Sequence, residues 1–152
     1  MDVRNIVERT VRKYQTRSPH ELAERMGIII HRCDLGTIRG YYFKKYRIKQ
    51  IFLNWDLTES EEKFVLAHEC GHAIMHPNSN TPFLMENTYF SKNRLENEAN
   101  QFAAELLIPD EIILNNPGFT IEQLARLTGF EEKLIRFKAY NKQKNEREHY
   151  GF

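Results

Sequence analysis

The segment from Thr58 to Pro77 places three histidines in one helix whose two ends are both marked in the sequence. Thr58 and Glu61 have the spacing of a capping box, which opens a helix. His76-Pro77 ends it, because the residue before a proline is disfavoured in the α conformation. Between these ends the residues FVLAHECGHAIM are mostly apolar, so the helix must be largely buried and its histidines need partners inside the core.

His68 and His72 are four residues apart, so their rings lie one above the other on the same face of this helix. Two neutral imidazoles placed in this way can bind one zinc ion, and catalytic zinc takes three protein ligands and leaves one position for water. Glu69 completes the pattern HExxH, written here as HECGH. It is rotated by about a third of a turn from His68, which suits a general base acting on that water better than a ligand.

A simpler interpretation is that these are ordinary helix histidines beside a solvent-facing glutamate. It has to explain titratable side chains in a buried helix, where unpaired polar groups are costly and metal binding would satisfy them. Gly71 is a second oddity, because glycine costs about 1 kcal/mol inside a helix, and a close approach of backbone or substrate would explain it. His76 lies about 12 Å along the axis from His68, too far to share an ion, so we interpret it as supporting the site or the helix end.

The third ligand should come from the segment RLENEANQFAAELL, which offers Glu96 and Glu98. At helical spacing Glu96 falls inside the apolar stripe, whereas Glu98 and Glu105 fall on the opposite flank, where a solvated carboxylate needs no explanation. Asn100 shares the face of Glu96 and is placed to orient a ligand. We therefore favour Glu96 as the third ligand, with Glu98 as the alternative. Glu96 has another possible role, a capping box with Asn93 at the start of the helix.

The order of the remaining predicted elements is typical of an α+β fold. Besides the two helices above, shorter helices are predicted at 2–16, 18–27, 110–115, 120–128 and 131–140, and strands at 27–33, 38–43 and 49–54. We expect one zincin-like domain over residues 1–152, in which a small antiparallel sheet of about three strands packs on the histidine helix and on the glutamate-bearing helix. Residues 77–93 are predicted to be a loop that crosses the site, and the chain from 141 onward a frayed polar tail.

Composition limits the classes of protein to which this chain can belong. With 152 residues and 41% hydrophobic content, the chain suits one domain. A formal net charge of +1 gives no basic field for nucleic acid and no acidic excess for disorder. We expect Cys33 and Cys70 to be reduced thiols. The charged N-terminus lacks the apolar core of a signal peptide, and no run reaches the about 20 apolar residues of a membrane span, so a cytoplasmic protein is expected.

Two stretches, QIFLNWDLTESEEKFVLAHECGHAIMH and ENEANQFAAELLIP, resemble the ImmA/IrrE family of zinc metallopeptidases, an abridged zincin of the Glu-zincin type. The resemblance implies that Zn²⁺ is held by His68, His72 and Glu96. It also implies that Glu69 is catalytic and that the reaction is hydrolysis of a peptide bond. Members of the family often lie in phages and integrative elements and cut a helix-turn-helix repressor, which makes such a repressor the expected protein substrate.

A few other residues near the motif need an assignment. Cys70 stands where relatives commonly carry a larger apolar residue, and its place in the helix points it away from the two histidines, so we treat it as core. Candidates for stabilising the oxyanion of the reaction are Tyr41, His76 and Tyr89.

The C-terminal segment TIEQLARLTGFEEKLIRF, within residues 110–140, resembles a helix-turn-helix. A DNA-binding regulator is therefore a second hypothesis for the function. Glu131 and Glu132 argue against it, because they open the would-be recognition helix where phosphate contacts favour basic residues. We favour a helical pair that packs on the catalytic core or docks the substrate. A third hypothesis is a zincin-like protein that binds its partner without cutting it.

Overall fold

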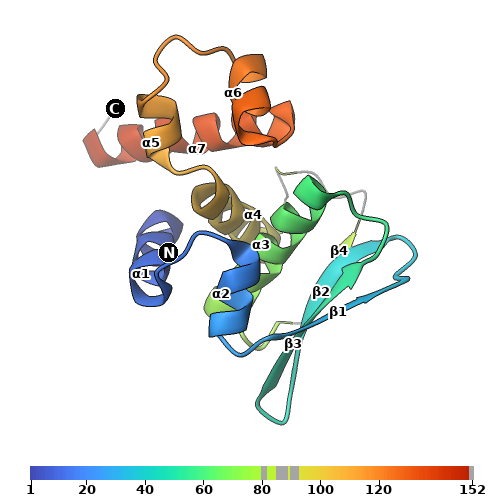
Figure 1. The fold of residues 1–152 in the computed structure, drawn as a ribbon. Coiled ribbons are helices and arrows are strands. Elements are labelled where there is room, and N and C mark those ends of the chain that lie inside the picture. The colour runs from blue at the N-terminus through green and yellow to red at the C-terminus, as the bar shows by residue number, and fades with distance from the viewer. Residues whose placement is uncertain (80–81, 85–88, 90–92, 151–152) are drawn as a thin grey trace.

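Two helices, α3 (Glu59–Met75) and α4 (Arg94–Leu107), pack against each other at the centre of the molecule (Figure 1). The computed structural model describes residues 1–79, 82–84, 89 and 93–150. In it α3 contacts α4 and also strands of the sheet, and further helices cover the rest of this core. The sequence prediction of an α+β fold, with the sheet packed on the histidine helix, is confirmed.

The sheet has four strands among the described residues, in the order β1-β3-β2-β4. Their bounds are Ile29–Cys33 for β1, Ile38–Lys45 for β2, Ile48–Asn54 for β3 and Phe83–Leu84 for β4. β2 and β3 form the predicted antiparallel hairpin, and β4 pairs antiparallel with β2. Tyr46 and Arg47 make the turn of the hairpin with φ of 53° and 67°, as in a two-residue turn that matches the twist of its strands.

The sheet is mixed, which corrects the expected antiparallel arrangement, because β1 pairs with β3 in parallel. β3 carries Ile51 and Leu53, both fully buried, and takes the central position that such apolar residues require. The connection at 34–37 leads from β1 to β2, but these two strands are not neighbours in the sheet. β3, the second strand of the hairpin, lies between them and pairs with β1. Short connections usually join antiparallel neighbours, which is why the sequence pattern was misleading here.

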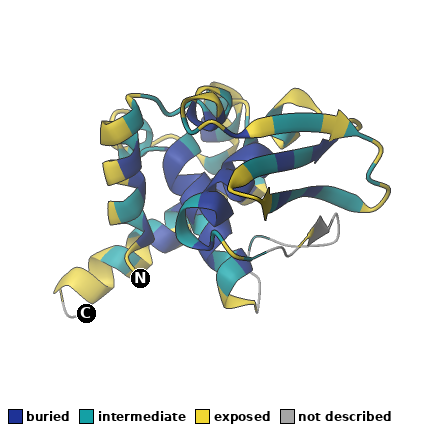
Figure 2. Cartoon of the chain, turned by 90° about the horizontal axis from the view of Figure 1, so that it is seen from below, coloured by how far each residue is buried: buried dark blue, intermediate teal, exposed yellow. Residues whose placement is uncertain are grey.

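The burial of α3 follows from this arrangement. The helix is buried without interruption from Phe64 to Ala73, as the dark blue centre of Figure 2 shows. The sheet, α2 (Pro19–Arg25) and α4 each contact it, while α1 (Val3–Tyr14) packs on α4. The expectation of a largely buried histidine helix is therefore confirmed.

Gly71 marks the closest approach of α3 to α4. A Cβ atom at this position would lie 3.0 Å from the Cβ of Phe102 and 3.1 Å from its ring. The expectation that a close approach explains this glycine is confirmed, and the neighbour is an aromatic side chain of α4. The contact fixes the spacing of the two helices that carry the candidate ligands.

The C-terminal part consists of α5 (Asp110–Leu114), α6 (Ile121–Thr128) and α7 (Glu132–Tyr150). The predicted frayed tail was wrong up to Tyr150, because α7 continues through it. Charged pairs at helical i,i+4 spacing, Lys142 with Glu146 and Lys144 with Glu148, support this extension. Residues 151–152 of the predicted tail lie outside the described residues.

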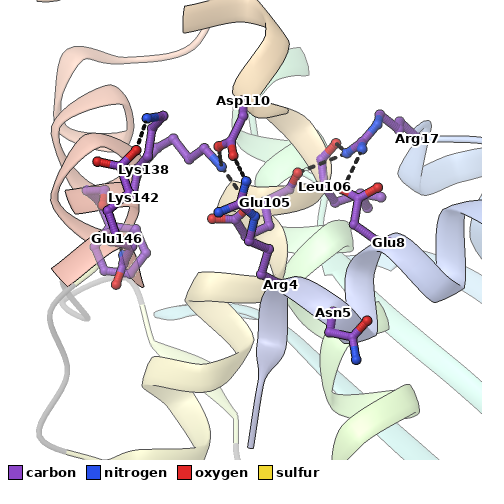
Figure 3. A network of polar contacts seen from close by, with 12 residues as sticks. Arg4, Asn5, Glu8, Arg17, Glu105, Leu106, Asp110, Lys138, Lys142 and Glu146 are labelled. Carbon is purple, nitrogen blue, oxygen red and sulfur yellow. Dashed lines mark hydrogen bonds and ion pairs between the residues drawn. The ribbon is translucent and has the colours of Figure 1, made fainter. Parts of the chain in front are cut away.

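A buried ion-pair network holds α7 against the core (Figure 3). The side chain of Lys138 is fully buried, and its Nζ lies 2.6 Å from Glu105 of α4 and 2.8 Å from Asp110 of α5. Arg4 of α1 also pairs with Asp110. Burial lowers the pKa of Lys138, and Glu105 acts against this shift. Glu105 is therefore paired and buried, which corrects the expectation of a solvated carboxylate.

The predicted loop over residues 77–93 is described at 77–79, 82–84, 89 and 93, where it contributes β4, and the remainder of that prediction lies outside the described residues. Cys33 and Cys70 are both free thiols, as expected. Across the part of the chain that the structure describes, no helix combines the length and apolar character needed to cross a membrane.

Candidate metal centre

His68, His72 and Glu96 come together where α3 meets α4. The Nε2 atom of His72 lies 2.8 Å from one carboxylate oxygen of Glu96, and the Nε2 atom of His68 lies 3.3 Å from the other. One ligand atom from each residue lies within 4.8 Å of the others, and all three residues are buried. The structure thus brings together the three residues that the sequence singled out as metal ligands.

Glu96 is oriented by the way α4 begins. The side chain of Asn93, the N-cap, accepts hydrogen bonds from the backbone N–H groups of Leu95 and Glu96. The carboxylate of Glu96 points instead at the two histidines of α3. The capping role that the sequence left open for Glu96 therefore belongs to Asn93, and the glutamate side chain is available for the site.

A side chain of α4 sets the tautomer of His68. The Nδ1 atom of His68 lies 2.7 Å from Oδ1 of Asn100, while the Nδ2 group of Asn100 donates to the backbone oxygen of Tyr89 at 3.0 Å. Since an amide oxygen only accepts, Nδ1 of His68 carries a proton, and Nε2 is the ring atom that faces Glu96 and would bind a metal. Asn100 thus has the orienting position expected from the sequence.

His72 has a different partner at the same ring atom. Its Nδ1 lies 3.0 Å from Nδ1 of His76, and Nε2 of His76 lies 2.9 Å from Glu98. Glu98 also accepts a hydrogen bond of 2.8 Å from Nε of Arg94. The structure therefore places Glu98 with His76 rather than with His68 and His72.

Glu98 corrects a prediction, since the sequence pattern assigned it to a solvated flank. It is 8% exposed, as is its partner His76. Burial acts to raise the pKa of Glu98, but His76 and Arg94 outweigh this and lower the pKa. One signal of this arrangement was present in the sequence, because His72 and His76 have the same i,i+4 spacing as His68 and His72, so their rings are neighbours.

Glu69 is fully buried, and neither of its carboxylate oxygens has a hydrogen-bond partner among the described residues. Burial raises its pKa well above the ordinary value, and the charge of Glu96 adds to the shift. The backbone of Tyr42 acts weakly in the opposite direction. A buried carboxylate with so few partners among the described residues is costly, and a water or another group bound beside it would stabilise it.

Two other ionisable groups of the site, Glu96 and His68, have lowered pKa values. Burial acts to raise the pKa of Glu96, but hydrogen bonds and charges of His68 and His72 outweigh it and bring the pKa to about 2. Burial lowers the pKa of His68, and Glu96 opposes the shift. A charged Glu96 beside a neutral His68 is the protonation state that zinc ligands need.

The donor set fits a zinc ion. Two imidazole Nε2 atoms and one carboxylate form the His₂Glu set that is common in catalytic zinc sites, which keep a fourth position open. One ligand atom from each of the three residues lies within 4.8 Å of the others, so these residues could hold one ion between them. A water held in the open position would also give Glu69 the partner that it lacks.

The remaining sequence candidates lie elsewhere. Cys70 is buried with its Sγ toward the backbone oxygen of Pro19, so it belongs to the core, as expected. The hydroxyl of Tyr89 donates to Glu131, and the ring of Tyr41 stacks on Phe52. His76, the third oxyanion candidate, is engaged by His72 and Glu98.

A small cavity lies beside the site and was not predicted. It has a volume of about 180 Å³, and its lining combines apolar side chains with Arg39, Ser60, Glu61 and Glu131. Phe64, one turn before His68, forms part of its wall, with its ring edge-on to Tyr89 at a centroid distance of 5.0 Å. Arg39 is influenced by the charges of Glu61 and Glu131, and burial lowers its pKa. These residues come from four segments of the chain, so no local pattern could reveal them.

Comparison with known proteins identifies relatives. A model of a peptidase family, described as the IrrE N-terminal-like domain, matches residues 23–140. The chain is 39% identical over 146 residues to "Uncharacterized immunity region protein 2" of Bacillus phage phi105, covering 94% of this chain and 92% of that protein. It is 28% identical over 128 residues to "Metallopeptidase ImmA" of Bacillus subtilis (strain 168), covering 81% of this chain and 75% of that protein.

Proposed function

We propose that this chain, which belongs to the IrrE N-terminal-like family of metallopeptidases, is a zinc-dependent endopeptidase that cuts a helix-turn-helix repressor of a phage or mobile element. One observation carries the proposal. The metal-binding atoms of His68, His72 and Glu96 lie within 4.8 Å of one another, next to the buried carboxylate of Glu69 that lacks a hydrogen-bond partner among the described residues.

The side chains divide the chemistry among them. His68, His72 and Glu96 would hold zinc, which polarises the scissile carbonyl and activates water. Glu69 takes the proton from the attacking water, and the raised pKa of its carboxyl group suits it to keep that proton until the leaving amine accepts it. Burial of the site excludes bulk water, which strengthens each of these interactions.

The proposed substrate class rests on the relatives. One is named an immunity region protein of a phage, and another is named Metallopeptidase ImmA. A repressor acts on DNA in the cytoplasm, so the proposed peptidase would act there as well. The cavity next to Phe64 provides a place for a substrate side chain, with Arg39, Glu61 and Glu131 as its charged lining residues.

The DNA-binding hypothesis is weaker than the peptidase hypothesis. In a helix-turn-helix the second helix presents its residues to the major groove. Here α7 turns Leu134, Ile135 and Lys138 into the protein, and it packs on α4. The pairing of Lys138 with Glu105 and Asp110 further removes a positive charge from any DNA-facing surface. These contacts support a structural role for the α6–α7 pair.

The proposal is tested with purified helix-turn-helix repressors from phage immunity regions as substrates. Wild-type protein loaded with zinc should convert the repressor into two fragments, and mass spectrometry would give the cleaved bond. Glu69→Gln should bind zinc but leave the repressor intact. Cleavage by Glu69→Gln at the wild-type rate would contradict the role of Glu69. An intact repressor with the wild type, together with salt-dependent binding of duplex DNA, would favour the regulator hypothesis instead.

A further inference from the structure

We infer that His76 and Glu98 are positioning residues that fix the tautomer and orientation of His72 for metal binding. The inference rests on the proposed metal centre and assigns two residues that the HExxH pattern does not include. Its basis is a continuous line of hydrogen bonds from the surface residue Arg94 through Glu98 and His76 to His72. We call these four residues the α3–α4 relay.

The direction of each hydrogen bond in the relay follows from its chemistry. Glu98 accepts from Arg94 through one carboxylate oxygen, which leaves the other to accept from His76 at 2.9 Å. A carboxylate only accepts, so Nε2 of His76 carries the proton. In a neutral His76 the Nδ1 atom is then an acceptor, and the proton in its 3.0 Å contact with His72 must come from Nδ1 of His72.

This sequence of donors belongs to the zinc-bound state. Nε2 of His72 lies 2.8 Å from the carboxylate of Glu96, which only accepts, so without zinc this contact places on Nε2 a proton that zinc would replace. The Nδ1–H form that the relay favours in a zinc-bound His72 is also the form that Asn100 favours in His68, by a single direct bond of 2.7 Å. Both ligand histidines are therefore held from α4 at Nδ1, one directly and one through His76. Partners of this kind raise the basicity of a ligand and fix its ring, and losing one commonly costs about 10- to 100-fold in metal affinity.

The burial of the relay supports a specific role rather than a surface pair. His76 and Glu98 are each 8% exposed, whereas the side chain of Arg94 is 79% exposed. An exposed arginine that anchors a buried carboxylate explains how Glu98 stays charged at this depth. Without these hydrogen bonds, burying the polar ring of His76 at the end of α3 would be unfavourable.

The first test uses wild-type protein loaded with zinc. Long-range ¹H–¹⁵N correlation spectra show which ring nitrogen of a histidine carries the proton. We expect the Nδ1–H form for His72, with zinc on Nε2, and the Nε2–H form for His76. A spectrum with His76 in the Nδ1–H form would overturn the inference, and it would do so whether or not the protein proves to be a peptidase.

The second test measures zinc affinity by competition with a chromophoric chelator. Glu98→Leu and His76→Leu should each weaken zinc binding about 10- to 100-fold. Because both act through the same bond to His72, the double variant should bind zinc no more weakly than His76→Leu alone. Glu105→Gln is the matched control, since it also removes a buried carboxylate of α4, and its zinc affinity should equal that of the wild type.

The outcomes separate this inference from the proposed function. Wild-type zinc affinity in both single variants, with folded proteins by circular dichroism, would contradict the role of the relay and leave the peptidase proposal intact. Equal losses in Glu98→Leu and Glu105→Gln would show general damage to α4 and also count against it. If wild-type protein binds no zinc, the metal centre and the relay both fail. If the wild type binds zinc, the relay variants lose affinity and no repressor is cut, the relay stands and the peptidase proposal fails.

Discussion

Glu69 and Glu96 are both buried, yet their carboxyl groups have pKa shifts in opposite directions. The pKa of Glu96 falls to about 2 because His68 and His72 outweigh the cost of burial, whereas the pKa of Glu69 rises well above its ordinary value because of burial and the charge of Glu96. One carboxylate is thus kept charged, as a ligand requires, and the other is made basic, as a proton carrier requires.

Glu69→Gln should stabilise the metal-free protein at neutral pH. The carboxyl group of Glu69 has a higher pKa in the folded protein than in the unfolded chain. The free energy of unfolding is therefore greatest below the pKa of the unfolded chain, and it falls as the pH rises from there to the pKa of the folded protein. Glutamine cannot ionise, so it removes this loss. Urea unfolding of chelator-treated wild type and variant across this pH range would measure the difference. Equal stability at neutral pH would contradict the unpartnered carboxylate.

Gly71→Ala should destabilise the protein by about 1 kcal/mol. Overpacking against Phe102 costs about 1 to 3 kcal/mol, and the better helix propensity of alanine returns about 1 kcal/mol. Because α4 has to move away, zinc affinity should fall as well. Urea unfolding and chelator competition measure the two effects. A variant more stable than the wild type, with unchanged zinc affinity, would show that the helix contact has room for a methyl group.

Lys138→Met should cost about 3 kcal/mol of stability, because Glu105 and Asp110 lose the cation that compensates their buried charge. The exposed Lys133→Met on the same helix is the control and should change stability little. Adding Glu105→Leu to Lys138→Met should recover part of the loss. The two lysine variants giving the same unfolding midpoint would contradict the importance of this network.

Acid should weaken the contact between α3 and the N-terminal part of the chain. Arg32 and His20 bind Glu62 at 2.6 and 2.8 Å, and the pKa of Glu62 is lowered chiefly by its hydrogen bond to Arg32, against the effect of burial. Because the pKa of Glu62 is lower in the folded protein, this carboxylate adds stability at pH values above its pKa in the unfolded chain. That stability is lost as the pH falls through its pKa in the folded protein. Glu62→Gln should therefore flatten the fall in stability below about pH 4.5. An unchanged slope would exclude this contribution.

The helices and the residues of the proposed metal centre could be singled out from the sequence because their signals are local. The Thr58–Glu61 capping box and the apolar periodicity of α3 and α4 are complete within one segment. The same periodicity places Glu96 on the core-facing side of α4. Two helices that each carry polar residues on their core-facing sides are expected to face each other, and this predicted that Glu96 lies near His68 and His72.

The errors came from partners that lie far away in the sequence. Glu98 and Glu105 were assigned to solvent because their helix face is polar, but His76 and Lys138 cover them. The parallel pairing of β1 depends on which strand takes the centre of the sheet. Local composition also suggested a frayed tail, whereas pairs such as Lys142 with Glu146 extend α7.

The most direct test of the metal centre is elemental analysis of protein purified without chelators, comparing the wild type with Glu96→Ala, Glu98→Ala and the control Glu105→Ala. We predict about one zinc per chain in the wild type and in the control, none in Glu96→Ala, and a chelator-sensitive zinc in Glu98→Ala. Wild-type protein that stays metal-free after zinc is added, or Glu96→Ala with a full complement of zinc, would contradict the account.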